Sequence, residues 1–124
     1  MTKAKYIDGF VLTIPKTKIA VYRKLAADAA RVWKRFGALD YKECMIDDAK
    51  PKFVVNTFGR ITKQKPSETV WFSYITYKNR KHRDAVNTKV MKHFDKKYPD
   101  KKMSDMPFDM KRMSYAGFSV EVSS

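Results

Sequence analysis

Two segments with the side-chain pattern of β-strands place the strongest constraint on the fold of this chain. They are residues 6–14 (YIDGFVLTI), followed by Pro15, and residues 70–77 (VWFSYITY). In each segment both alternating sets of side chains are largely apolar. Because a strand inside a sheet can bury both of its faces, we expect these two segments to be the central strands.

The apolar spacing between and after these strands predicts two helices. Residues 16–36 carry one apolar stripe and end at Gly37, a residue typical of the position just past a helix. The second predicted helix runs from an N-cap at Asn79 to about Phe94. The stripe of the first helix comprises Ile19, Tyr22, Leu25 or Ala26, Ala29, Val32 or Trp33, and Phe36.

Two more segments have the alternation of strands. Residues 38–46 have one polar face, which indicates an edge strand, and residues 113–122 form the last predicted strand. The polar segment 47–67 predicts a long connection that contains one short strand at most. Residues 95–106 are rich in lysine and contain Pro99, so we expect an irregular or short helical connector there.

The order of the predicted elements, β-α-β-loop-β-α-β, is that of the split βαβ or ferredoxin-like arrangement. We therefore predict an α+β fold with a four-stranded antiparallel sheet, in one domain over residues 1–124. Two helices cover only one face of such a sheet, whereas the central strands are apolar on both faces. We expect a second copy of the chain to cover the other face, giving a homodimer.

Composition narrows the class of protein further. Hydrophobic residues make up 44% of the chain, which argues against disorder, and no apolar segment is long enough to cross a membrane. The N-terminal apolar run is short and lacks a cleavage site, so it does not predict a signal peptide. The lone Cys44 gives no sign of an oxidising compartment. We expect a cytoplasmic protein without a membrane partner.

The net charge of +14 suggests a polyanion as partner. Basic residues concentrate between Lys78 and Lys102. No aromatic motif that reads bases accompanies them, so nucleic-acid binding would be weak and non-specific, and a solvated helix face is the other interpretation. The polyanion-contact candidates are Lys78, Arg80, Lys81, Lys96, Lys97, Lys101 and Lys102.

Motifs for common cofactors are missing from the sequence. The four glycines are scattered singly, so neither a dinucleotide fingerprint nor a phosphate-binding loop is present. His82 and His93 would lie ~16 Å apart along one helix, too far to share a metal ion. We predict no metal and no cofactor.

Three stretches of the sequence carry a family resemblance: YIDGFVLTIPK, ETVWFSYITYKNRKHRDAVNTKVM and MPFDMKRMSYAGFSVEV. They resemble the YbaA-like family of small bacterial proteins of unknown function (DUF 1428), which is similar in fold to the dimeric α+β barrels. The resemblance implies this fold and a homodimer, and it implies no activity. The connector 95–102 is richer in lysine than is typical of the family.

Candidate site residues come first from polar side chains on the predicted central strands. Asp8 lies among apolar neighbours, so it must be paired or functional. Lys111 or Arg112 would be its ion-pair partner, and the alternative role is a polar anchor in a ligand pocket. Ser73 and Tyr74 could line the same pocket or fill the core.

Further candidates lie in the second predicted helix and before the last strand. His82 could be a general base, or a surface histidine whose protonated form is disfavoured by Arg80 and Arg83. The resemblance adds Arg83 and Asn87 to the candidates. Asp109 and Arg112 either orient a turn or bind a ligand, and no catalytic residue is predicted.

The leading hypothesis is an uncharacterised homodimeric α+β barrel protein that binds a small, partly apolar molecule between helices and sheet. It could be a cofactor-independent enzyme. The alternative is a module that binds RNA or another polyanion non-specifically through residues 78–102.

Overall fold

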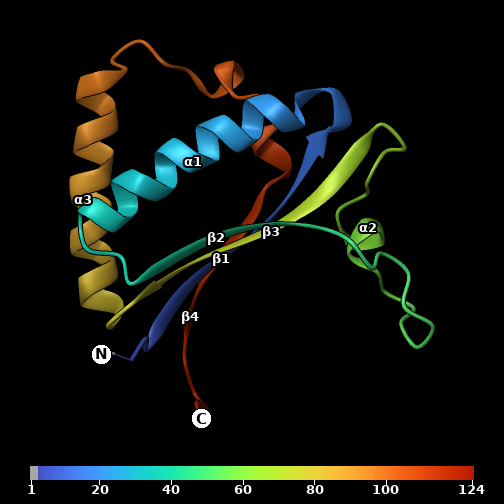
Figure 1. The fold of residues 1–124 in the computed structure, drawn as a ribbon, viewed down its shortest axis with the longest axis horizontal. Helices are drawn as coiled ribbons and strands as arrows, with labels where there is room; N and C mark the ends of the chain where they lie inside the picture. The colour runs from blue at the N-terminus through green and yellow to red at the C-terminus, as the bar shows by residue number, and fades with distance from the viewer. Residues whose placement is uncertain (1–2) are drawn as a thin grey trace.

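A computed structural model describes residues 3–124 as a sheet with helices above one face (Figure 1). Among the helices of these residues, none is both long enough and apolar enough to cross a membrane. The chain has an α+β fold with an open, four-stranded antiparallel sheet. The strands are β1 Tyr6–Pro15, β2 Asp40–Met45, β3 Glu68–Tyr77 and β4 Ser114–Ser119. The helices are α1 Ile19–Arg35, α2 Phe58–Ile61 and α3 Arg80–Lys97, with 3-10 turns at Lys16–Lys18, Met103–Asp105 and Met110–Arg112.

The strands lie in the order β2-β3-β1-β4. β1 and β3 therefore form the centre of the sheet and β2 forms an edge, which confirms both predictions. β1 pairs with β3 along its whole length, from Tyr6 opposite Tyr77 to Pro15 opposite Glu68. This long pairing fixes which side chains of the two strands share a face.

Helices α1 and α3 lie on the same side of the sheet and enclose the core with it (Figure 1). The core has two separate clusters. One lies under α3 and the end of α1, and the other lies under the first turns of α1. The first comprises Val32, Ala38, Ile75, Tyr77, Val86 and Val90. The second comprises Leu12, Ile14, Tyr22, Ala26 and Trp71.

The other face of the sheet carries the second alternating set of side chains. Phe72 and Phe118 on this face are 42% and 56% exposed, and Val11 and Ile7 are the respective partners in register. Apolar side chains on both faces of the central strands were predicted from the sequence. α1 and α3 therefore leave this face open around Phe72 and Phe118, whereas Thr13 and Val70 on the same face are buried.

Several boundaries differ from the sequence predictions. The connection 47–67 contains the helix α2 and no strand, because the Thr57 side chain accepts a hydrogen bond from the N–H of Arg60 and caps one helical turn. α3 continues past Phe94 to Lys97, where two lysines suit the negative end of the helix dipole. Pro99 then excludes the helical conformation for the residue before it.

Candidate functional site

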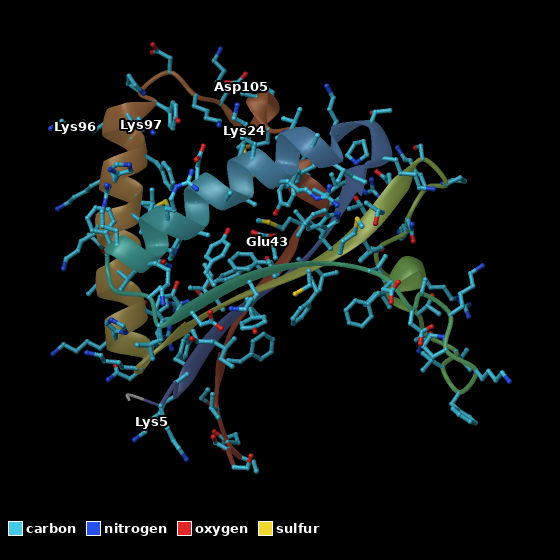
Figure 2. All side chains as sticks on the ribbon, in the orientation of Figure 1. Lys5, Lys24, Glu43, Lys96, Lys97 and Asp105 are labelled. Atoms are coloured by element: carbon cyan, nitrogen blue, oxygen red, sulfur yellow. The ribbon has the colours of Figure 1, made fainter. Side chains whose placement is uncertain are left out.

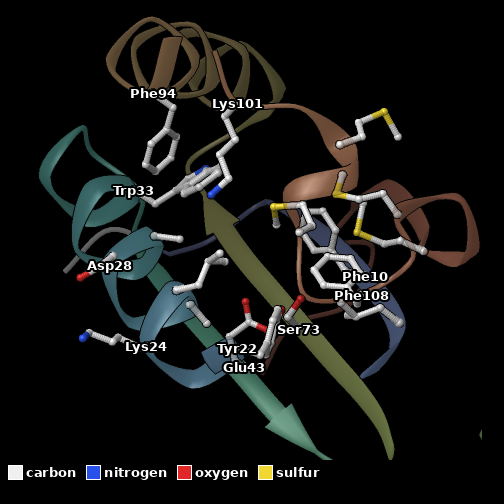
Figure 3. Close-up of a pocket in the computed structure, with 18 of the residues that line it drawn as sticks. Phe10, Tyr22, Lys24, Asp28, Trp33, Glu43, Ser73, Phe94, Lys101 and Phe108 are labelled. Carbon is white, nitrogen blue, oxygen red and sulfur yellow. The ribbon is translucent and has the colours of Figure 1, made fainter. Parts of the chain in front are cut away.

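A cavity of about 670 Å³ lies between α1, the end of α3, the connector that follows it and the sheet (Figure 3). It touches both core clusters: Leu12, Tyr22 and Ala26 belong to one, and Ile75 to the other. The cavity therefore separates the two halves of the core. Its size is within the range of ordinary small-molecule pockets, roughly 300–1,000 Å³.

Glu43 is the acidic residue on the cavity's sheet side. Alternation along β2 places Tyr41 and Glu43 on the helix-facing side, opposite Ile75 and Ser73 of β3. Figure 2 shows Glu43 in the space between β2 and α1. The sequence analysis did not select Glu43. The sequence pattern that could have identified it is that Glu43 is the one acid in the alternating set Leu39, Tyr41, Glu43 and Met45, whose other members are apolar or aromatic.

Two tyrosines hold the Glu43 carboxylate in place. The hydroxyl of Tyr22 donates to Oε1 at 2.8 Å, and the hydroxyl of Tyr41 donates to Oε2 at 2.7 Å. Burial raises the pKa of Glu43, although the hydrogen bonds from Tyr41 and Tyr22 partly oppose this change. Burial and then the charge of Glu43 raise the pKa of each tyrosine, so both stay hydrogen-bond donors.

The rest of the cavity lining is mainly apolar and rich in methionine. Ser73 adds one buried hydroxyl beside Glu43, and Figure 3 shows the two side chains close to Tyr22. Methionine side chains adapt readily to ligands of different shape. The methionines of the lining are Met91, Met103, Met106, Met110 and Met113, and the phenylalanines and tryptophan are Phe10, Trp33, Phe94 and Phe108.

Charged side chains occur at the cavity's outer parts. Lys24 and Asp28 of α1 point outward, whereas Lys101 of the connector points inward (Figure 3). The Lys101 ammonium lies 5.1 Å from the centre of the Tyr98 ring. Asp95 and Lys102 also belong to the lining. The cavity therefore has an apolar interior with one acid and a charged opening.

The structure places most predicted site residues outside this cavity. Asp8 is 1% exposed and accepts hydrogen bonds from Arg83 at 2.7 Å and from Tyr115 at 3.0 Å. The prediction that Asp8 pairs with Lys111 or Arg112 was wrong. The Arg112 guanidinium pairs instead with Glu68 at 2.6 Å. Asp8 lies opposite Ile75 of β3, and Glu68 is seven residues from Ile75 on the same strand. The two acids are therefore ~23 Å apart along the sheet.

Asn87 and His82 both have structural contacts in α3. The Asn87 Oδ1 accepts hydrogen bonds from Trp33 Nε1 at 3.1 Å and from the Tyr77 hydroxyl at 3.2 Å. The Nδ1 of His82 accepts from the N–H of Lys78 at 3.0 Å. The pKa of His82 is lowered, as predicted, but burial is the main cause and Lys78 and Lys89 follow, in place of the predicted arginines.

The other candidates divide between the open face and the turn before β4. Ser73 is the one predicted ligand-binding residue that lines the cavity. Tyr74 pairs with Gly9 and Lys42 and so belongs to the opposite, open face. Asp109 accepts a hydrogen bond from the N–H of Lys111 at 3.0 Å and caps a short turn, which was the structural alternative.

The predicted polyanion contacts lie at both ends of α3 and in the connector. Lys78, Arg80 and Lys81 are exposed near the start of the helix, and Lys96 and Lys97 are exposed at its end. Figure 2 shows Lys96 and Lys97 at the far end of α3 from the sheet. The two groups are separated by about 25 Å of helix, so they do not form one compact patch.

Within residues 3–124, no group of three or more histidine, cysteine, aspartate or glutamate side chains could hold a metal ion. The absence of a metal and of a cofactor stays a prediction.

Comparisons with known proteins identify the family. A family model described as "Protein of unknown function (DUF1428)" matches residues 5–110. The "Uncharacterized protein YbaA" of Escherichia coli strain K12 is 42% identical over 118 residues, which cover 92% of this chain and 94% of YbaA. YbaA of Shigella flexneri matches to the same extent. The chain therefore belongs to the DUF1428 family of proteins of unknown function, as its three characteristic segments predicted.

Proposed function

We propose that this protein binds a small, partly apolar molecule in the cavity between α1, α3 and the sheet. The observation that carries the proposal is the carboxylate of Glu43, held by two tyrosine hydroxyls in an otherwise apolar cavity. Pockets with an apolar lining and a few oriented polar groups are typical of small-molecule sites. A cavity that was only a packing defect would be lined by apolar side chains and would not contain an oriented carboxylate.

A catalytic role is an extension of this binding hypothesis. Burial raises the pKa of Glu43, and a raised pKa makes a carboxylate a better proton acceptor. It could therefore act as a proton acceptor in a reaction without metal or nucleotide. Tyr22, Tyr41 and Ser73 would orient the substrate beside it.

We further propose the ferredoxin-like, dimeric α+β barrel arrangement that the sequence predicts. The strand order β2-β3-β1-β4 and the position of both long helices on one side support it. The open face exposes Phe72 and Phe118, and Phe53 in the connection before α2 is 98% exposed. A second copy that packs against the open face would remove these side chains from water. A cytoplasmic location is part of the same proposal.

Filling the cavity tests the binding proposal. Ala29 lines the cavity, so Ala29→Trp would occupy it, whereas Ala27, two residues earlier on the exposed side of α1, gives the matched variant Ala27→Trp. We expect a panel of small amphiphiles to shift the methionine-methyl NMR signals of the wild type and of Ala27→Trp but not of Ala29→Trp. If no amphiphile shifts these signals in the wild type, the proposal is wrong.

The alternative function is non-specific binding of RNA or another polyanion, and the net charge of +14 favours it. We expect affinity that depends on charge alone to be equal for unrelated RNA sequences and to fall steeply with salt. A salt titration of two unrelated RNAs measures both properties. Discrimination between the two at physiological salt would make nucleic-acid recognition the better hypothesis.

A further inference from the structure

The acids Asp8 and Glu68 are buried and Glu43 is half-buried, and the three differ in their partners. Asp8 forms an ion pair with Arg83 at 2.7 Å, and Glu68 forms one with Arg112 at 2.6 Å. Glu43 accepts hydrogen bonds from two neutral tyrosines instead, and it belongs to none of the ion pairs among residues 3–124. Glu43 is half-buried, and neutral donors leave the charge of its carboxylate unbalanced, so a positively charged ligand would stabilise the ionised form.

The geometry keeps part of this carboxylate available. A carboxylate has about four acceptor positions, and the tyrosine hydroxyls use one on each oxygen. Tyr22 is itself fixed by edge-on contacts with Trp71 at 5.1 Å and Phe108 at 5.6 Å. The acid is therefore oriented before any ligand arrives, and it has room to accept two more hydrogen bonds.

The surroundings of Glu43 suit a cation with an apolar body. Ammonium groups are attracted to the faces of aromatic rings, and the cavity offers Trp33, Phe10 and Phe108. Its methionines would contact the apolar part of such a ligand. An anionic ligand would face the charge of Glu43 in a medium of low polarity, where repulsion is strong.

We propose that the cavity binds an organic ammonium ion, a protonated amine on an apolar body, with Glu43 as its counter-ion. This inference rests on the proposed function and names its ligand class. The ammonium donates hydrogen bonds to the Glu43 carboxylate, and the body occupies the space between the methionines and the aromatic side chains.

Other charges around the cavity set the pH behaviour. The other titratable groups that line it come from α1, β2, α3 and the connector, whereas β1 and β3 contribute none: Tyr22, Lys24, Asp28, Tyr41, Asp95, Tyr98, Lys101 and Lys102. Burial raises the pKa of Glu43, so its carboxylate form becomes more populated as pH rises. Binding of the ammonium ion requires the carboxylate, so it strengthens as pH rises.

Three probes of equal length test the ligand class: hexylammonium, hexanol and hexanoate. Titrations followed by the methyl signals of Met91 and Met110 report cavity binding, and Met45, which does not line the cavity, is the internal reference. At about pH 8 we expect hexylammonium to bind about tenfold more tightly than hexanol. The reason is that a hydrogen bond between two charged groups stabilises the complex more than one from a neutral hydroxyl. Hexanoate should bind most weakly.

Two variants separate Glu43 from general charge effects. In Glu43→Gln the preference for hexylammonium over hexanol should fall to within about twofold, whereas the exposed Asp48→Asn, with the same change of charge, should keep it. Lys101→Met tests the inward-pointing lysine. If only Lys101→Met prefers the ammonium ion, and the wild type does not, then Lys101 already pairs with the Glu43 carboxylate in the wild type. That result would overturn the proposal.

The outcomes distinguish this inference from the proposed function. Equal binding of hexanol and hexylammonium in the wild type refutes the ammonium class and leaves a neutral ligand site. If none of the three probes moves the cavity methionines, this inference fails together with its basis, the binding function. Tighter binding of hexanoate would mean that the lysines at the opening select the ligand.

Discussion

At the scale of residues, Asp8 shows how strongly a buried charge depends on its partner. Its carboxylate is 1% exposed and contacts the Arg83 guanidinium and the Tyr115 hydroxyl. Arg83 also donates to Asp84 and lies 4.9 Å from the centre of the Tyr6 ring. One arginine therefore connects the first turn of α3 to the two strands β1 and β4.

Removing this arginine should destabilise the protein strongly. Arg83→Met leaves the Asp8 carboxylate buried with one neutral donor, so we expect the free energy of unfolding to fall by about 3–5 kcal/mol. The double variant Asp8→Asn/Arg83→Met should lose less, because no charge is left unpaired. Urea denaturation measures both, with the exposed Lys81→Met as control. A loss below about 1 kcal/mol in Arg83→Met would contradict this account.

Glu43 and Glu68 should have opposite effects on the pH dependence of stability. Burial raises the folded pKa of Glu43 above its ordinary value of 4.5, so its stabilising contribution is present below that value and is lost as pH rises through the folded pKa. Glu43→Gln cannot ionise. Its free energy of unfolding should therefore improve relative to wild type as pH rises from about 4 to about 8.

Glu68 provides the comparison with opposite sign. The hydrogen bond from Arg112 lowers its pKa, so its contribution is present above the unfolded value and is lost as pH falls. Relative to wild type, Glu68→Gln should therefore become less stable as pH rises from about 2 to about 5, and the difference should stay constant above that range. Urea denaturation across pH measures both variants. Parallel curves for wild type and Glu43→Gln would contradict the assigned burial of that acid.

At the scale of elements, the stability of α3 depends strongly on the contacts at its ends, because its buried apolar face is small. Only Val86 and Val90 of its eighteen residues are buried. The Asn79 side chain accepts a hydrogen bond from the N–H of His82 at 2.8 Å. His82 in turn contacts the backbone of Lys78 and of Gly37, which joins the start of α3 to the end of α1.

Loss of this cap should weaken the helix measurably. Asn79→Ala leaves the N–H of His82 without its side-chain acceptor, and we expect a cost of about 1 kcal/mol in the free energy of unfolding. Amide exchange should accelerate in the first turn of α3. Asn56→Ala in the exposed connection is the control. Unchanged exchange in that turn would show that packing alone holds the helix start.

At the scale of the whole molecule, the sheet has one covered and one open face. The open face is apolar at Phe72 and Phe118, and the edges of the sheet are β2 and β4. A large apolar face in contact with water is unusual for a monomeric domain. Pairing of two such faces about a two-fold axis closes the assembly.

We therefore expect a dimer that persists at micromolar concentration and buries on the order of 2,000 Å². Phe72→Asp places a charge in the proposed interface and should give monomers or unfolded protein, whereas Ala20→Asp on the exposed side of α1 should stay dimeric. Analytical ultracentrifugation gives the mass of each. A folded wild-type monomer at micromolar concentration would refute the barrel arrangement.

The sequence by itself determined the four strands and the two long helices of this protein, though not α2, because the signals of those elements are local. Alternation identified β1 and β3 as central strands, and Asn79 and Gly37 marked the ends of helices. These features depend on neighbours a few residues apart, which a single sequence contains. The same locality allowed the prediction of two apolar faces on the central strands.

Only the tertiary structure decided which side chains meet. Asp8 pairs with Arg83, which is 75 positions away, and Glu43 contacts Tyr22, which is 21 positions away. Such contacts depend on strand register and on how α1 and α3 lie across the sheet. Alternation along β2 assigns Glu43 to the same face as Tyr41, but only the packing of α1 across the sheet brings the Tyr22 hydroxyl to its carboxylate.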